Sequence, residues 1–280
     1  MEIDLRNQIK ETRAAHAKRH NETRFEDLGV ELGPLTGAMR DQSRWRESDH
    51  LYPAWQVYAN EIEAVLEYAQ VAGQLGRYWP RLIARRTQHD SALDELRVAR
   101  HFQSKRFQIA EWEPTGQDER KGEYLVRGPL NRDVFVEVKG PRWEGELKPE
   151  EIQAGRTKQP KDLYLEARAI APWKQIQLEV DKAYEKFVPT MTNLLVIAGH
   201  RLFVSLEYGS DIHAQQALYD VVHSGCFATP AYMKLGGVGI FWLGTDGKET
   251  WYQMELFTNR FALEPLPGDF IEAFVKRSDS

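Results

Sequence analysis

The hydrophobic pattern divides the chain into a helical first part and a second part that mixes short apolar runs with helical ones. Between Ala54 and Arg86 apolar residues recur at spacings of three and four, which is typical of amphipathic helices, and we expect Pro80 to break the run. Residues 32–49 are polar and contain glycine and proline, which predicts a loop. Residues 1–24 are strongly charged and predict a solvated helix or arm. We therefore expect a helical N-terminal region over residues 1–90.

From Ser91 onward, helical and strand-like patterns alternate. The first helix is expected over Ser91–Lys105, begun by a capping box in which Ser91 is followed by Asp94. Further helices are expected at Trp173–Phe187 and His213–His223. Runs of strand-forming residues predict strands at Phe107–Trp112, Glu123–Val126, Asp133–Gly140, Asn193–Ala198, Val238–Leu243 and Trp251–Phe257, with another candidate at Leu202–Leu206. This order predicts an α/β domain over residues 91–280, with a mixed central sheet flanked by helices.

A long polar segment, residues 140–172, separates the strand at Asp133–Gly140 from the next helix. It is rich in lysine, arginine and proline. A connection of this length inside a domain is usually functional or partly disordered. Its basic side chains fit two interpretations, a solvated loop or a track along a phosphate backbone.

Composition narrows the classes of function. The net charge of −5 over 280 residues argues against a broad basic surface for nucleic acid, although it permits a local basic groove. Most of the negative excess falls after residue 200, so a polyanion would meet the first two thirds of the chain. Cys226 is the only cysteine, which excludes an intrachain disulfide and a cysteine-rich zinc site. We see no secretory signal and no apolar run of about 20 residues, so we expect a cytoplasmic protein without a membrane partner.

The strand at Asp133–Gly140 carries two charges where the pattern predicts burial. Side chains alternate between the faces of a strand, so Glu137 and Lys139 share one face with Phe135, and the valines occupy the other. Charges on a buried strand are costly unless they pair or bind something. Glu137 and Lys139 are therefore either a structural ion pair or half of a metal-dependent active site.

Further acidic residues lie where they could join this pair. Glu95 is on the first helix of the second part, and Glu123 opens a strand that the following turn makes an antiparallel neighbour of the strand with Glu137. Two carboxylates together with a backbone carbonyl, here that of Val138, form a hard oxygen site suited to Mg²⁺. A lysine beside such a site can orient a water molecule and stabilise charge on phosphorus.

This arrangement resembles the PD-(D/E)XK nuclease superfamily, the phosphodiesterases that include many restriction endonucleases, recombination exonucleases and junction resolvases. The resemblance covers about residues 91–257. Glu137-Val138-Lys139 matches the (D/E)XK element, Gly122-Glu123 stands at the family's Pro-Asp, and Glu95 is similar to its acidic position on the first helix. The helix that begins near Gln175 resembles the one that often supplies a glutamine or lysine. Glutamate replaces the usual aspartate and no proline precedes it, so Asp118 and Glu119 compete for that role.

The resemblance implies a restriction endonuclease-like core and a Mg²⁺-dependent nuclease, with Mn²⁺ as an alternative metal and DNA as the expected substrate. Glu95, Glu123, Glu137 and the Val138 carbonyl would hold the metal, and Lys139 and Gln175 would complete the catalytic set. Restriction, phage defence and repair are all compatible settings. The alternative is a non-catalytic subunit of the same fold that binds nucleic acid or protein. We expect residues 1–90 to mediate homo-oligomerisation or contact with a protein partner.

Overall fold

The computed structural model describes residues 30–43, 55–84, 86–140, 179–198, 227–245 and 248–274. The chain forms two compact units. The first consists of Met1–Leu93 with Thr245–Thr250, and the second of Asp94–Gly244 with Trp251–Ser280. The expected strand at Leu202–Leu206 and the expected helix at His213–His223 lie outside the described residues.

The described part of the first unit is helical. It contains α2 (Pro34–Gln42), α3 (Trp55–Val71) and α4 (Leu75–Leu82), followed by the start of α5 (Arg86–Ser104). Pro80 was expected to end a helix, but it lies inside α4. The break falls at Gly73 instead, because its φ of +69° is a left-handed conformation that glycine adopts most readily. Proline lacks only its own backbone N–H, so it removes one intrahelical hydrogen bond, and α4 ends two residues later at Leu82.

The prediction of a loop over residues 32–49 is wrong, since α2 occupies most of the described part of this range. Pro34 stands at the first turn of α2, where a missing backbone N–H is harmless. The residue before it, Gly33, has no side chain to cap the helix. Glu63 of α3 supplies the cap, because its carboxylate accepts hydrogen bonds from the backbone N–H groups of Leu35 (3.0 Å) and Thr36 (2.7 Å). A cap from a residue this distant in sequence leaves no local signal.

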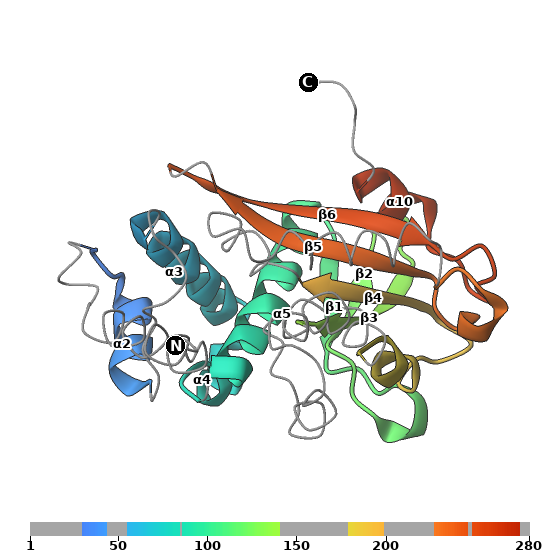
Figure 1. Ribbon diagram of the computed structural model, residues 1–280, viewed down its shortest axis with the longest axis horizontal. Helices are drawn as coiled ribbons and strands as arrows, with labels where there is room; N and C mark the ends of the chain where they lie inside the picture. Colours follow the sequence, from blue (N-terminus) through green and yellow to red (C-terminus); the bar gives the residue numbers. More distant parts are fainter. Residues whose placement is uncertain are drawn as a thin grey trace, which may run out of the picture. The chain divides into compact units, whose positions relative to one another are not determined.

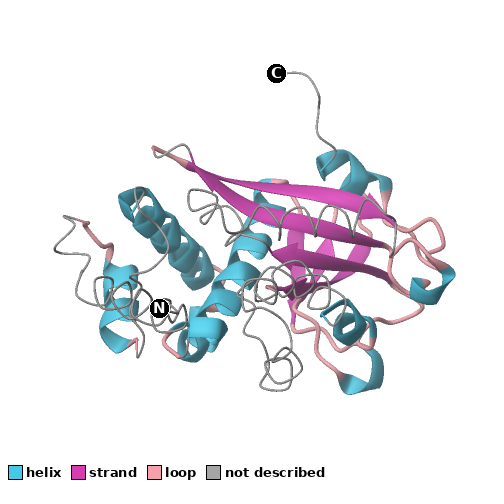
Figure 2. Cartoon of the chain, in the orientation of Figure 1, coloured by secondary structure: helices cyan, strands magenta, loops and turns pink. Residues whose placement is uncertain are grey.

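The second unit is built on a six-stranded mixed sheet, which confirms the predicted α/β class (Figures 1 and 2). The strands lie in the order in which they occur along the chain, and β1, β2 and β3 pair antiparallel, whereas β3, β4 and β5 pair parallel. Each of the six expected main strands is present, and no end differs from its predicted position by more than two residues. Their bounds are β1 (Gln108–Trp112), β2 (Tyr124–Arg127), β3 (Asp133–Lys139), β4 (Thr192–Ala198), β5 (Gly237–Thr245) and β6 (Thr250–Thr258).

Helix α5 begins earlier than predicted. Ser91 lies within the helix and is not its N-cap, and its hydroxyl accepts a hydrogen bond from Arg81 (3.2 Å). The predicted capping box is therefore wrong, because the helical backbone continues upstream of it. An unexpected helix, α10 (Gly268–Phe274), follows β6. Its Phe270 ring packs 4.4 Å from that of Phe107, and this aromatic contact, distant in sequence, fixes a helix of only two turns.

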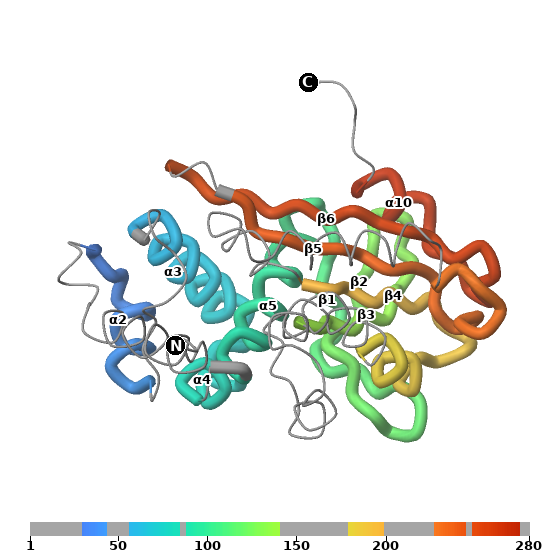
Figure 3. Tube along the Cα trace, viewed as in Figure 1, coloured from blue at the N-terminus to red at the C-terminus, as the bar shows by residue number. Residues whose placement is uncertain are grey.

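The two faces of β3 meet different helices. The Val136 face is shared with Tyr124, whose hydroxyl donates to the backbone carbonyl of Glu95 on α5. The opposite face, with Phe135, packs against the helical residues 179–184 and the turn that follows them. Figure 3 follows the chain from these residues into β4. A charged residue on the Phe135 face is therefore enclosed between the sheet and this helical segment.

None of the helices in the described residues is long and apolar enough to cross a membrane.

Candidate active site

Glu137 is the central residue of the site, with a side chain that is 0% exposed on the Phe135 face of β3. One of its carboxylate oxygens, Oε1, accepts hydrogen bonds from the ammonium groups of Lys139 and Lys186, each at 2.5 Å. The two lysine side chains are 19% and 23% exposed. Charge-assisted hydrogen bonds of this kind are short and strong, so the carboxylate is held in one orientation.

The second carboxylate oxygen of Glu137, Oε2, is buried and has no hydrogen-bond partner among the residues that the structure describes. Most buried polar atoms have a partner, and leaving one unsatisfied costs about 1–3 kcal/mol or more for a charged group. Both lysines bind the other oxygen. Oε2 is therefore the atom at which this carboxylate can accept a further ligand.

Glu123 immediately precedes β2 and interacts electrostatically with Glu137. The regular pairing of β2 with β3 ends at Tyr124 and Val136. The Glu123 backbone N–H donates to the carbonyl of Val136 (3.1 Å), the residue that is already paired with Tyr124, so the ladder does not continue in regular register to Glu137. The electrostatic interaction shows that Glu123 lies near Glu137, and a metal site shared by the two carboxylates stays a prediction.

The surroundings of Glu123 disfavour its charge. Burial raises its pKa well above the ordinary glutamate value, and the nearby carboxylates of Glu95 and Glu137 raise it further. Lys139 and Lys186 act in the opposite direction but do not cancel these effects. Glu123 therefore holds a proton more tightly than an exposed glutamate does, and a further positive charge in the site would oppose this effect.

Glu95 is buried on α5 and contributes to this repulsion. All three predicted acidic residues are thus within electrostatic range of one another. Among the residues that the structure describes, however, no three acidic, histidine or cysteine groups are placed so that they could hold a metal ion together. The competing acids Asp118 and Glu119 are exposed on the turn before β2, whereas Glu123 interacts with Glu137.

Lys139 remains a cation in this setting. Burial alone would lower its pKa, but the charge and hydrogen bond of Glu137, together with Glu123 and Glu179, raise the pKa above the ordinary lysine value. A lysine that keeps its charge can bind a phosphate oxygen or orient a water molecule, but it is a poor general base at neutral pH.

The backbone carbonyl of Val138 points toward the edge of β3 that pairs with β2, at a position beyond the end of β2. Carbonyls two residues apart along a strand point to the same side, and the Val136 carbonyl accepts the bond from Glu123 on the β2 side. Pairing of β2 with β3 stops at Tyr124 and Val136. The predicted ligand at Val138 is therefore directed past the end of β2.

Lys186 is a site residue that the sequence analysis missed. It follows the helical residues 179–184, in the region where the family resemblance predicts a glutamine or lysine. Gln175, the residue chosen there, lies outside the described residues, so its role stays a prediction. Lys182, on the described helical segment, is 63% exposed and pairs with Glu179. The signal that could have found Lys186 is the family resemblance, had it been applied to residues beyond the end of the helix.

The donor atoms suit a hard divalent cation. Mg²⁺ prefers oxygen ligands, and it commonly binds through one or two carboxylates and retains several waters. The unpartnered Oε2 of Glu137 and the unfavourable charge on Glu123 are both features that a cation would relieve. Glu123, Glu137 and the Val138 carbonyl would hold it. Such a site needs water or substrate oxygens to complete its coordination.

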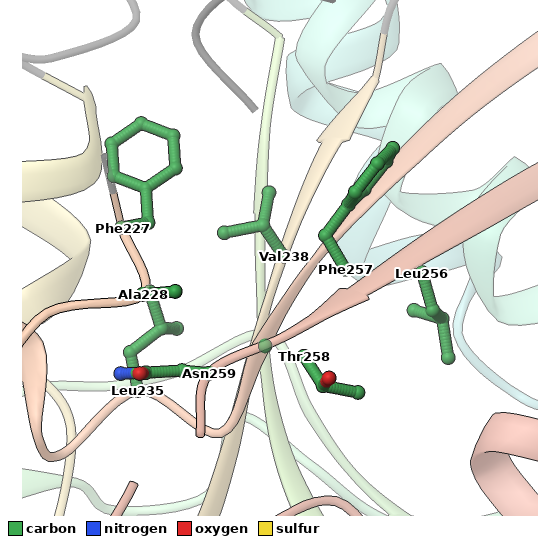
Figure 4. A pocket seen from close by; sticks show the side chains of 9 residues that line it. Phe227, Ala228, Leu235, Val238, Leu256, Phe257, Thr258 and Asn259 are labelled. Atoms are coloured by element: carbon green, nitrogen blue, oxygen red, sulfur yellow. The ribbon is translucent and has the colours of Figure 1, made fainter. Parts of the chain in front are cut away.

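A pocket of about 300 Å³ lies elsewhere in the second unit, beside the strand ends shown in Figure 4. Its lining includes the apolar side chains of Phe227, Leu235 and Val238 and an about equal share of polar surface. The amide of Asn259 in this lining already donates to the Tyr232 carbonyl and accepts from the Phe261 N–H. Because the lining contains no titratable side chain, we place the chemistry at Glu137 rather than in this pocket.

Comparisons of the chain with protein-family models, with curated proteins and with solved structures find no match. The geometry of the site is therefore the basis on which a function can be argued.

Proposed function

We propose that this protein is a Mg²⁺-dependent nuclease that hydrolyses phosphodiester bonds, with DNA as the substrate and a restriction endonuclease-like core in residues 91–280. The observation that carries the proposal is the environment of Glu137. A fully buried carboxylate has two lysines on one oxygen, a second oxygen without a partner among the described residues, and the carboxyl of Glu123 within electrostatic range. Mn²⁺ is expected to replace Mg²⁺.

The order of the elements supports the resemblance to PD-(D/E)XK nucleases. Helix α5 with Glu95 precedes β1, the acid Glu123 immediately precedes β2, and the Glu137-Val138-Lys139 element lies on β3. The helical segment before β4 is followed at once by Lys186, which takes the role that the resemblance gives to a lysine or glutamine. Gly122 replaces the family's proline for a local reason, since a Cβ atom there would lie 2.3 Å from the Phe135 ring.

Each side chain has a task in this reaction. Glu123 and Glu137, with the Val138 carbonyl, would bind the metal, and Glu95 would assist by binding metal or water. A bound divalent cation lowers the pKa of a water molecule and neutralises charge on the phosphoryl group. Lys139 and Lys186 are cations placed on the same carboxylate, so they can orient the attacking water and the phosphate oxygens. Burial of Glu137 keeps these charges in a medium where they act more strongly than in water.

A cleavage panel tests the proposal. Single- and double-stranded DNA and RNA would be incubated with Mg²⁺, with Mn²⁺ and with EDTA. We expect metal-dependent cleavage of DNA that Lys139→Ala reduces by about 10²-fold or more, the usual scale for loss of one stabilising group in a polar active site. Lys182→Ala is the matched control, because that lysine is exposed and bound to Glu179. Equal cleavage by the Lys139→Ala variant and the wild type would remove the assignment.

A second candidate function is a non-catalytic subunit of the same fold that binds nucleic acid or protein. It is favoured by the two lysines, because they already compensate Glu137 without a metal. Fluorescence anisotropy with labelled oligonucleotides separates the two candidates. Binding without cleavage of any substrate in either metal would support the second.

Restriction, phage defence and repair are the settings that we propose for such an activity, in the cytoplasm. We also propose that the helical N-terminal region brings two copies of the chain, or the chain and a protein partner, together. Light scattering on the full-length protein tests the first of these, since a monomer at micromolar concentration would contradict self-association.

A further inference from the structure

The turn between β1 and β2, residues 113–123, makes contact with the segment that carries Lys186. The backbone N–H of Gln117 donates to the Lys186 carbonyl (2.9 Å). The Gln117 side chain accepts a hydrogen bond from the ammonium of Lys234 (2.9 Å), and Arg120 forms an ion pair with Glu185. The turn is therefore attached to the lysine that binds Glu137 and to the residue before it.

The contact with Lys186 is close enough to require glycine. A Cβ atom at Gly116 would lie 2.4 Å from the Lys186 carbonyl oxygen and 2.9 Å from the Phe135 ring. Real Cβ atoms do not approach a backbone oxygen so closely. The backbone of the turn thus lies directly against the backbone of Lys186.

The turn is also strained. Glu113, Asp118 and Glu119 have φ values of +53°, +54° and +61°, a left-handed conformation that residues with a side chain seldom adopt. Strained backbone persists only where surrounding contacts hold it, and such strain gathers at functional sites. The contacts to residues 185 and 186 are among those that hold this turn.

The far end of the turn leads straight into the site. Glu123 is its last residue, and its N–H is bound to the Val136 carbonyl next to Glu137. One short turn therefore sets the backbone of Glu123 and, through Gln117, that of Lys186. These two side chains approach Glu137 from different elements, and the turn is the covalent and hydrogen-bonded link between them.

We propose that Gln117 is a positioning residue, whose backbone N–H fixes Lys186 so that its ammonium group reaches Oε1 of Glu137. The expected effect on catalysis rests on the nuclease activity proposed above, whereas the effect on Lys186 itself does not. Gln117 has no contact with Glu137 in this scheme and acts only through Lys186.

The test compares Gln117→Pro with Gln117→Ala. Both remove the side chain that binds Lys234, but only proline removes the N–H that binds Lys186. Gly116, the residue before Gln117, is extended, with φ −93° and ψ −156°, the kind of conformation that a residue before proline favours. Gln117 opens a tight turn in which Asp118 and Glu119 are left-handed, and the Arg120 N–H donates to the Gln117 carbonyl (3.1 Å), a bond that proline at position 117 keeps. The alanine variant is therefore a matched control for everything except the N–H.

The first readout is the rate at which a lysine-acylating reagent labels Lys186, followed by mass spectrometry without added metal or DNA. We expect Gln117→Pro to label about fivefold faster than Gln117→Ala, the factor that corresponds to one net hydrogen bond. Exposed Lys182 is the internal reference and should not change. Equal labelling of Lys186 in the two variants would overturn the proposal whether or not the protein is a nuclease.

The second readout is cleavage, in which Gln117→Pro should lower kcat by about fivefold relative to Gln117→Ala and leave KM unchanged. If the wild type cleaves nothing, the proposed function fails and the labelling result still decides the role of Gln117. Should the proline variant not fold, hydrogen exchange on the wild type replaces it. The proposal then requires that the Gln117 amide is protected from exchange. It also requires that, as mild denaturant is added, the exchange rate of this amide and the labelling rate of Lys186 rise together. Rapid exchange of the Gln117 amide in the native protein would contradict the proposal.

Discussion

Replacement of Glu137 by glutamine tests whether the buried carboxylate holds the two lysines. The change preserves shape but removes the negative charge that both ammonium groups bind. Glutamine can accept a hydrogen bond from one lysine, but its amide nitrogen is a donor and cannot face the other. We therefore expect the variant to fold with lower stability and to lose metal-dependent cleavage.

The magnitude follows from the geometry. Each ammonium nitrogen is 2.5 Å from the same oxygen, so the two are no more than about 5 Å apart. Two unit charges at about 5 Å repel by about 3 kcal/mol at an effective dielectric constant of about 20. Removing one partner of a buried ion pair usually costs about 3–5 kcal/mol. Because Lys139 and Lys186 retain some contact with solvent, we expect the low end, about 3 kcal/mol.

Chemical and thermal unfolding measure this loss directly. A decrease of about 3 kcal/mol corresponds to roughly 6–12 °C in Tm for a unit of this size. The matched control is Glu185→Gln, which makes the same change in an ion pair whose carboxylate is 63% exposed, and we expect it to cost less than about 1 kcal/mol. Addition of Mg²⁺ should stabilise the wild type and Glu185→Gln but have no effect on Glu137→Gln.

A triple variant separates charge from shape. Replacing Glu137 by leucine and both Lys139 and Lys186 by methionine removes this carboxylate and both of its lysine partners at similar volume, and leaves Glu95 and Glu123 in place. Apolar replacement of a complete buried ion cluster is often neutral, or stabilising by about 1–4 kcal/mol, so this variant should be at least as stable as the wild type and inactive. The reasoning would be refuted if Glu137→Gln were no less stable than Glu185→Gln, since the lysines would then not depend on this carboxylate.

The remaining predictions concern two titrating groups and one helix cap. The raised pKa of Glu123 means that the folded state holds its proton more tightly than the unfolded state does. The free energy of unfolding should therefore fall as pH rises from the ordinary glutamate pKa through the pKa of Glu123 in the folded state. Glu123→Gln should remove this pH dependence in unfolding experiments. Burial and the charge of Lys105 lower the pKa of His101 to about 4. The contribution of neutral His101 to stability is therefore complete above about pH 6.5 and is lost as pH falls towards 4. His101→Phe should remove about 3 kcal/mol of this loss, measured as Tm against pH. Glu63→Ala should lower the stability of the first unit by about 1–2 kcal/mol and raise amide exchange in α2, whereas unchanged exchange at Leu35 and Thr36 would contradict the cap.

The strands of the second unit could be predicted because their signal is local. Short runs of β-branched and aromatic residues bounded by turns occur wherever the sheet has a strand, and the buried centre of β3 follows from its alternating valines. The meeting of Glu123 with Glu137 followed from the same reasoning, since a tight turn between neighbouring strands makes them antiparallel. The ends of the elements were less certain, because hydrogen bonds to other segments decide where a strand or helix stops.

The features that sequence reasoning missed all depend on contacts between distant residues. Helix α2 is capped by Glu63, 27 and 28 residues away from the groups it binds. Lys186 enters the site because the chain turns back over β3 after residue 184, and no periodicity in the sequence reports the reach of that turn. Helix α10 is held by aromatic packing on Phe107.

The charge cluster is difficult to explain as a device for stability. It lies on a strand face whose neighbour Phe135 packs in an apolar core, and side chains of the same volume without charge would fill that position at lower cost. Burial and the carboxylates of Glu95 and Glu137 raise the pKa of Glu123, and the two lysines bind only one oxygen of Glu137. The unfavourable charge at Glu123, and the second oxygen of Glu137, which has no hydrogen-bond partner among the described residues, are therefore the physical grounds on which we propose a cation site at this strand.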